Sequence, residues 1–122
     1  MNLIFEIDPV PKPRMNRSDA WKKRPCVVRY WEYKDKLVEI AKEFDFKLNS
    51  GILSVEFYIP MPKSWSVKKK SRMVFQPHTQ RPDLDNLIKA FQDCLLEEDS
   101  HIHTFYNVSK KWSGTGCIIV NV

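Results

Sequence analysis

The chain has 122 residues, of which 43% are hydrophobic and 29% charged, and its formal net charge at pH 7 is +5. This length suits one domain, residues 1–122, and the composition excludes a disordered chain. No apolar run reaches the ~18 residues of a membrane span, and the first residues lack the basic region and apolar core of a signal peptide. We therefore expect a single cytoplasmic domain with no membrane partner.

The predicted elements begin with a short strand over residues 2–7, whose apolar side chains alternate. Residues 10–25 are rich in proline and basic side chains, and we expect them to form a loop or arm. Apolar residues at helical spacing predict a helix over residues 30–44. After a turn at residues 49–51, alternation predicts a half-buried strand over residues 53–59.

Residues 60–82 show no periodicity and contain four prolines, the run Lys68-Lys69-Lys70, and the aromatic residues Trp65 and Phe75. A loop of this length in a compact domain is usually functional or mobile. Basic and aromatic side chains together suit contact with nucleic-acid phosphates and bases. A surface loop without a partner explains the composition equally well.

Residues 86–96 are predicted to form a second main helix. Residues 107–112 and 117–122 read as strands, joined into a hairpin by the glycine-containing turn at residues 113–116. The order is β-α-β-loop-α-β-β. We therefore predict an α/β (α+β) fold, a single mixed β-sheet with two main helices packed on it.

The three cysteines, Cys26, Cys94 and Cys117, are widely spaced and form no Cys-x-x-Cys pair. An odd number of cysteines at such spacing disfavours both a zinc site and a disulfide framework. We expect buried or half-buried thiols in a reducing compartment.

Basic side chains are concentrated in two segments. Residues 9–31 contain seven Lys and Arg and one acid, and residues 57–82 contain six Lys and Arg and no acid. This pattern favours a polyanion such as nucleic acid as partner, although a solvated basic face without a partner would look the same. The residues expected to bind phosphates are Lys12, Arg14, Lys68, Lys69, Lys70 and Arg72.

Residues 81–99, RPDLDNLIKAFQDCLLEED, gather acids in an otherwise basic chain. The six carboxylates are Asp83, Asp85, Asp93, Glu97, Glu98 and Asp99. On a helix, the apolar residues of this segment share one arc that can pack on the sheet. Asp85, Lys89 and Asp93 then line the opposite side at i, i+4 and i+8, and Asp85 is well placed as the N-cap.

Helix chemistry alone explains part of this pattern, since caps and Asp-Lys pairs stabilise a helix. It does not explain why Asp83 precedes Asp85, or why acids follow at residues 97–99, where the helix dipole disfavours negative charge. Clustered carboxylates repel unless a cation lies between them, and their oxygens suit Mg²⁺ or Mn²⁺. Such a metal activates water for phosphodiester hydrolysis, and Lys89 is placed to stabilise the developing charge.

The run RPDLDNLIKA at residues 81–90, followed by Asp93, resembles the signature of the RusA-type Holliday-junction resolvases. The arm at residues 11–14, the opening of the basic loop at residues 61–66 and the strand and turn at residues 110–114 fit the same family. The resemblance implies a small homodimeric α/β endonuclease, common in phages and prophages. Such an enzyme cuts branched DNA with Mg²⁺ or Mn²⁺ and needs no organic cofactor.

The resemblance also implies roles for single residues. Asp83 and Asp85 fall on the paired metal-binding aspartates of the family, and Lys89 falls on its catalytic lysine. Asp93 matches a family acid whose role is undefined.

A third metal ligand is implied near the end of the acidic segment. The spacer before the acidic pair is shorter than in the family pattern, and the pair reads Glu98-Asp99 instead of two aspartates. Asp99 is favoured because the residues after it restore the family register, with Glu97 and Glu98 as alternatives.

We therefore interpret the sequence as a metal-dependent endodeoxyribonuclease that cleaves four-way junctions in recombination or repair. A two-fold symmetric dimer would present two sites for the two symmetric cuts. The alternative is a nucleic-acid-binding module without activity, whose acids serve as caps and surface charge. A third interpretation is a transferase that binds a metal-nucleotide through its D-x-D motif.

Overall fold

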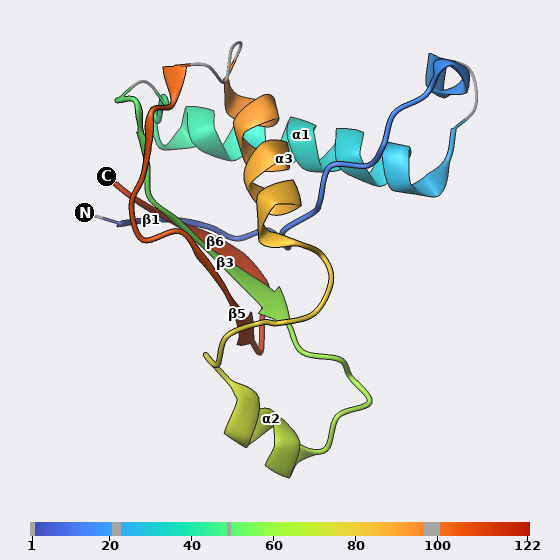
Figure 1. Ribbon diagram of the computed structural model, residues 1–122, viewed down its shortest axis with the longest axis vertical. Coiled ribbons are helices and arrows are strands. Elements are labelled where there is room, and N and C mark those ends of the chain that lie inside the picture. Colours follow the sequence, from blue (N-terminus) through green and yellow to red (C-terminus); the bar gives the residue numbers. More distant parts are fainter. Residues whose placement is uncertain (1, 21–22, 49, 97–100) are drawn as a thin grey trace.

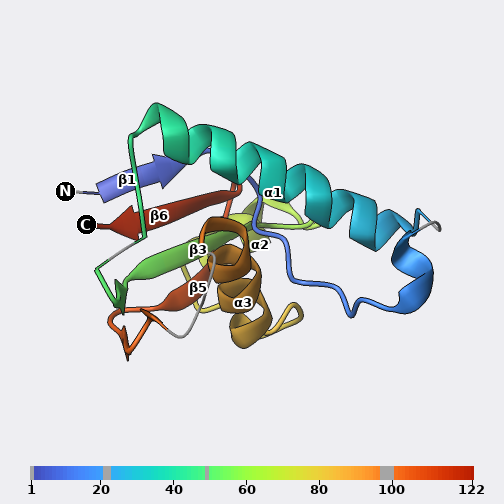
Figure 2. The same cartoon turned by 90° about the horizontal axis from the view of Figure 1, so that it is seen from above.

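The computed structural model describes residues 2–20, 23–48, 50–96 and 101–122. A four-stranded sheet in the order β1-β6-β3-β5 organises it (Figure 2). The strands are β1 (Asn2–Phe5), β3 (Val55–Pro60), β5 (Ser109–Ser113) and β6 (Cys117–Asn121). Strand β6 runs antiparallel to both β1 and β3, whereas β5 runs parallel to β3. The predicted mixed sheet is therefore confirmed.

Two helices, α1 (Pro25–Glu43) and α3 (Leu84–Leu95), pack on one face of this sheet (Figures 1 and 2). Phe5 and Phe57 are fully buried. Each of their rings meets Phe91 of α3 edge-on, with 6.2 Å between the ring centroids. The apolar arc predicted for this helix therefore forms its contact with the sheet, which leaves the opposite side of α3 for polar residues.

Helix α1 begins at Pro25, five residues before its predicted start. Proline is favoured in the first turn of a helix, because its missing N–H would have no partner there. Val27 and Tyr30 are buried and continue the apolar stripe of Tyr33 and Leu37. The prediction was wrong because the proline and basic residues concealed the first part of this stripe.

The predicted hairpin of the last two strands is also wrong, because β3 lies between β5 and β6. Phe57 of β3 is aligned with Lys110 of β5 on one side and with Ile118 of β6 on the other. Val55 and Phe57, on the helix-covered face of β3, are both fully buried, which suits a strand with a neighbour on each side. The connection at residues 114–116 therefore passes the end of β3 instead of forming a tight turn.

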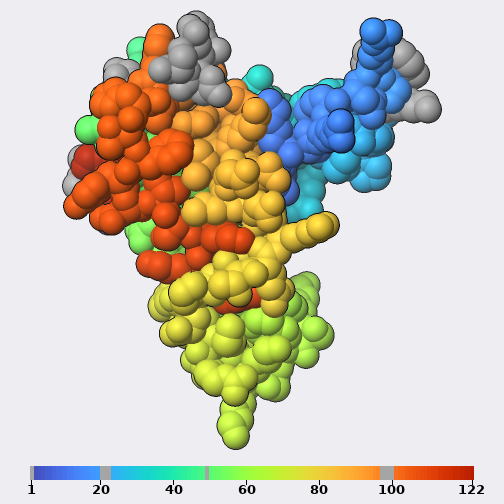
Figure 3. Space-filling model, viewed as in Figure 1, coloured from blue at the N-terminus to red at the C-terminus, as the bar shows by residue number. Residues whose placement is uncertain are grey.

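The segment predicted as a loop, residues 60–82, contains a short helix, α2 (Val67–Met73). The Ser66 hydroxyl caps this helix by accepting a hydrogen bond from the backbone N–H of Lys69 at 3.1 Å. No residue of α2 is buried, so the sequence carries no apolar period from which the helix could be predicted. Figures 1 and 3 show α2 as a lobe at one end of the molecule, away from α1 and α3.

Minor elements lie beside the main sheet. Strands β2 (Ile52–Leu53) and β4 (Thr104–Phe105) form a parallel pair outside it. A 3-10 turn covers Arg17–Ala20 within the predicted arm. None of the described helices has the length and hydropathy needed to cross a membrane.

All three cysteines are free thiols. Cys94 is buried and Cys117 half-buried, as predicted, but Cys26 is exposed. Cys26 lies in the first turn of α1 beside Val27, which occupies the buried stripe. Val27 is therefore covered by neighbouring residues, whereas Cys26 faces solvent.

Candidate active site at the start of helix α3

Asp83 is the residue from which α3 begins, and its carboxylate has no partner among the described residues. Its backbone is extended, with φ −67° and ψ 146°, and its carbonyl accepts a helical hydrogen bond from the N–H of Leu87 at 3.2 Å. An N-cap aspartate usually accepts a bond from the first N–H groups of its helix, but Asp83 makes no such side-chain bond. The prediction that Asp85 is the N-cap is wrong, because Pro82 restricts only the residue before it and the helix starts directly after Asp83.

Asp85 and Lys89 follow on the outer side of α3, one helical turn apart. Both side chains are exposed, as is that of Asp83. Among the residues that the structure describes, none of these three side chains has a hydrogen-bond or ion-pair partner. The helix dipole favours negative charge at this end, so the start of α3 tolerates both carboxylates without a protein cation.

Asp93, the next acid on this side of α3, is paired with the N-terminal arm. Its carboxylate accepts a short hydrogen bond from the ammonium of Lys12, and the two side chains are 23% and 29% exposed. The backbone N–H of Lys12 also donates to the carbonyl of Asn86 at 3.4 Å. Asp93 therefore anchors the arm to α3, and the charge of Lys12, predicted to bind phosphate, is engaged in this pair.

Lys110 of β5 holds the chain just before Asp83. Its ammonium donates to the carbonyl oxygens of Gln80 at 2.6 Å and Pro82 at 2.7 Å. The peptide bond between Arg81 and Pro82, which lies between these two carbonyls, is cis. Sequence reasoning missed Lys110, although alternation along the strand places it on the same face as buried Trp112.

His78 lies under the same segment. Its ring is 4% exposed and lies against Trp112, with 4.2 Å between ring centroids. Its backbone N–H donates to the carbonyl of Lys110 at 3.1 Å, and Phe75 and Gln76 also bond to the backbone of Trp112. Burial, together with the nearby charge of Lys110, lowers the pKa of His78 below its usual 6.5. The segment before Asp83 is therefore fixed along β5.

Four of the residues predicted to bind phosphate lie on α2. Lys68 and Arg72 are exposed and Lys70 is half-buried. The ammonium of Lys69 lies 4.1 Å from the ring centroid of Trp65, a cation-π contact. The structure therefore places this basic group on a lobe of its own (Figure 3), apart from the carboxylates of α3.

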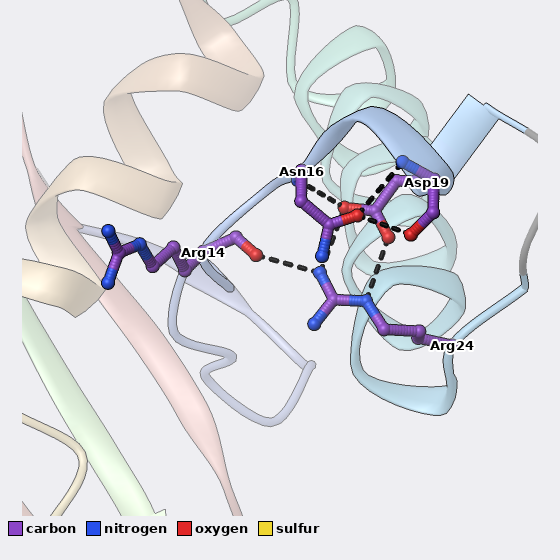
Figure 4. A network of polar contacts seen from close by, with 5 residues as sticks. Arg14, Asn16, Asp19 and Arg24 are labelled. Carbon is purple, nitrogen blue, oxygen red and sulfur yellow. Dashed lines mark hydrogen bonds and ion pairs between the residues drawn. The ribbon is translucent and has the colours of Figure 1, made fainter.

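Arg14, on the arm, adjoins a closed polar network (Figure 4). The guanidinium of Arg24 donates to both carboxylate oxygens of Asp19 at 2.8 Å and to the carbonyl of Arg14 at 2.7 Å. The backbone N–H of Asn16 donates to Asp19 at 2.7 Å. The hydrogen bond from Arg24 holds the pKa of Asp19 below its usual value. The Arg14 side chain points away from this network (Figure 4) and is exposed.

A pocket of about 580 Å³ opens beside Asp83, between the arm and the start of α3. Its lining includes Arg29 of α1, Arg81 and Asn86. Neither arginine forms an ion pair within the described part of the chain. Arg81 adjoins the acidic motif in sequence, whereas only the tertiary packing brings Arg29 to it, so no sequence signal marked Arg29.

The oxygens of Asp83 and Asp85 are of the kind that Mg²⁺ and Mn²⁺ prefer. Within the ranges that the structure describes, no group of three or more His, Cys, Asp or Glu side chains could hold a metal ion. The predicted third ligand, Asp99, and its alternatives Glu97 and Glu98 lie outside the described residues. The described part of the site thus fits a divalent cation in its donor type and supplies two of the three predicted ligands.

Comparison with known proteins bears on the whole chain. No curated protein matches it. The family model of endodeoxyribonuclease RusA matches residues 6–122, nearly the full length. With its acidic motif at the start of α3 and its mixed sheet, the chain belongs to the RusA endodeoxyribonuclease family, a family of Holliday-junction resolvases.

Proposed function

We propose that this chain is a divalent-metal-dependent endonuclease that cleaves four-way DNA junctions and related branched DNA. The observation that carries the proposal is the pair of exposed carboxylates, Asp83 and Asp85, which have no partner among the described residues. Carboxylates held close together repel, and a cation is the partner that removes the repulsion. In a chain of an endodeoxyribonuclease family, such a cation acts on a phosphodiester.

Bound Mg²⁺ or Mn²⁺ would supply polarisation of the phosphodiester and a water of lowered pKa. Asp83 and Asp85 would hold the metal, with Asp99 as the third ligand and Glu97 or Glu98 as alternatives. The ammonium of Lys89 lies one turn from Asp85 and would stabilise the charge that develops on the phosphate oxygens.

The basic residues would bring the DNA backbone to this site. Arg29 and Arg81 line the pocket beside Asp83, and their guanidiniums, which form no ion pair with a described residue, suit phosphate oxygens. Lys12 lines the same pocket, and the other residues predicted to bind phosphates are Arg14, Lys68, Lys69, Lys70 and Arg72. Phosphate contacts supply affinity and orientation but do not read sequence.

Two symmetric cuts in a junction call for two sites, which a two-fold homodimer supplies. A groove of about 1000 Å³, lined by residues of β1, β6 and α1, supports this assignment. Ile4 and Phe75, which line the groove, are 51% and 61% exposed. The groove is lined by both Glu32 and Lys36, so a second copy related by a two-fold axis would meet charges of opposite sign. Sedimentation equilibrium of the protein and of Ile4→Glu checks this interface, and the variant is expected to be monomeric.

The proposed reaction assigns the protein to recombination or repair of DNA in the cytoplasm of a bacterial or phage-infected cell. A phage or prophage origin belongs to the same proposal, because the resemblance to RusA-type resolvases implies it. The three cysteines form no disulfide with one another, which suits that compartment.

Cleavage of a synthetic four-way junction with Mn²⁺ tests the proposal. The wild type is expected to cut the junction and to spare linear duplex of the same sequence. Asp83→Asn should lose at least ~100-fold in cleavage rate, more than the loss usual for a group that only supports a ligand, while it still binds the junction. Asp35→Asn, which removes an exposed carboxylate from α1, is the matched control and should cut normally. If the wild type with Mn²⁺ leaves the junction intact but binds it, the chain is a binding module without activity.

A further inference from the structure

We propose that Lys110 is a positioning residue that sets the orientation of the Asp83 carboxylate toward its metal. The inference rests on the proposed function, since it concerns the same metal site. Lys110 does not touch the reacting groups. It acts through the backbone of residues 80–82, which its ammonium holds at two carbonyl oxygens.

The two hydrogen bonds of Lys110 bracket the turn that leads into Asp83. The distances are 2.6 Å to the Gln80 oxygen and 2.7 Å to the Pro82 oxygen, and hydrogen bonds from a charged donor are the shorter and stronger kind. The Pro82 carbonyl belongs to the peptide group that ends at the nitrogen of Asp83. A shift of this carbonyl therefore rotates the backbone of Asp83 itself.

Asp83 depends on this support because no described residue holds its side chain. An N-cap aspartate is usually held by a bond to its helix, and that bond is absent here. On the C-terminal side of Asp83, the helix fixes the backbone through the hydrogen bond from the N–H of Leu87 to the Asp83 carbonyl. On the N-terminal side, Pro82 has no N–H to donate. Among the described contacts, the hydrogen bond from Lys110 to the Pro82 carbonyl holds the backbone there.

Lys110 is itself held in a rigid part of the molecule. It is aligned with Phe57, a fully buried residue of the central strand β3. Its carbonyl accepts a bond from the N–H of His78 at 3.1 Å. A metal ligand must be placed to within about 0.5 Å, and support from the sheet supplies that precision more readily than a free loop would.

Lys111 provides a matched control because it carries the same charge at the next position. Alternation along β5 turns it to the other face of the sheet, where its ammonium lies 3.3 Å from the carboxylate of Glu56. It does not reach residues 80–82. A variant at Lys111 therefore reports the loss of one lysine from β5 without loss of the carbonyl contacts.

The test measures Mn²⁺ binding to the DNA-free protein by electron paramagnetic resonance. It compares the wild type with Lys110→Met and Lys111→Met. Supporting groups around a metal site contribute about 10- to 100-fold in affinity, so we expect Lys110→Met to bind Mn²⁺ at least ~10-fold more weakly. Junction cleavage by Lys110→Met should need correspondingly more Mn²⁺ and recover at saturation, whereas Lys111→Met should match the wild type in both.

Equal Mn²⁺ affinity of Lys110→Met and Lys111→Met would overturn the inference and leave the proposed function intact. A wild type that binds no Mn²⁺ would instead overturn the proposed metal-dependent function. Should Lys110→Met fail to fold, Lys110→Arg is compared with Lys111→Arg. The longer, planar guanidinium keeps the charge but changes the bond geometry. Mn²⁺ affinity at least ~3-fold weaker in Lys110→Arg supports the positioning role, and equal affinity overturns it.

Discussion

Asp19 and Asp83 both lie in the segment before a long helix, but they differ in burial and in the partners of their carboxylates. Asp19, ahead of α1, is 7% exposed and accepts hydrogen bonds from Arg24 and from the backbone of Asn16 (Figure 4). Asp83, ahead of α3, is exposed and has no side-chain partner within the described residues. Both oxygens of the Asp19 carboxylate accept hydrogen bonds from Arg24. The Asp83 carboxylate accepts no hydrogen bond from a described residue and can bind a ligand.

This difference separates a structural acid from a functional one more clearly than sequence does. Both aspartates lie in segments with basic neighbours, and both are of a residue type that caps helices. A buried carboxylate without a partner would be costly, so Asp19 must be paired. An exposed carboxylate carries no such cost, so Asp83 can be kept free for a ligand.

The largest expected effect comes from exchanging the two acids for asparagine. Asp83→Asn should abolish metal-dependent cleavage, a loss of at least ~100-fold, and should leave the melting temperature unchanged. Asp19→Asn should do the reverse: a lower melting temperature, because Arg24 loses its ionic partner, and near-normal cleavage at temperatures where the protein is folded. Thermal denaturation and junction cleavage measure the two effects. Equal losses of activity in both variants would contradict the comparison.

Lys89, like Asp83, is exposed and has no ion-pair partner among the described residues. Lys89→Met should reduce the rate of junction cleavage by about 100-fold or more, as loss of a group that stabilises transition-state charge does. Mn²⁺ affinity and the free energy of unfolding should change little, because no described contact is lost. Single-turnover cleavage and a Mn²⁺ titration measure these effects, with Lys42→Met, an exposed lysine of α1, as control. A large fall in metal affinity would assign Lys89 a different role.

The exposed site could be predicted from sequence because its signal is local. The apolar arc of α3 and the motif around Asp83 and Asp85 both lie within one short segment, and the structure confirms the arc. The roles of those acids stay predictions, and the third ligand lies outside the described residues.

The supporting residues could not be predicted, because their contacts join distant segments. Lys110 reaches Pro82 only because β5 lies beside β3, and the predicted hairpin would have paired β5 with β6 instead. The position of α2 was missed for another reason, since a short helix with no buried residue leaves no apolar period. Helix capping by Ser66 was the only local signal for it.

The ion pair of Lys12 and Asp93 tests how much a paired charge on α3 contributes to the free energy of unfolding. Lys12→Met and Asp93→Asn should each lower the free energy of unfolding by about 1 kcal/mol, and the double variant should cost less than the sum of the two. Urea denaturation of the four proteins measures the coupling energy. Additive effects would show that the pair does not stabilise the arm. Lys12→Met alone should also weaken junction binding if the arm contacts phosphates.

His78 provides the smallest and most specific effect, because its ring nitrogen is both buried and unpaired. The Nδ1 atom of His78 is buried and has no hydrogen-bond partner among the described residues. Asp83 also lacks a partner among them, but its side chain is exposed and can therefore reach a ligand. Burial and the charge of Lys110 lower the pKa of His78 below 6.5. The unfolded chain therefore binds a proton at a higher pH than the folded protein does.

As the pH falls below about 6.5, protonation of the unfolded state should cost stability until the folded pKa is reached. The slope for one group cannot exceed about 1.4 kcal/mol per pH unit. His78→Phe keeps an aromatic ring against Trp112 and removes the titration, so it should lose less stability than the wild type between pH 6.5 and 5.5. Urea denaturation at several pH values measures the difference. Parallel pH profiles would mean that His78 binds its proton equally well in the folded state, and that its ring nitrogen has a partner after all.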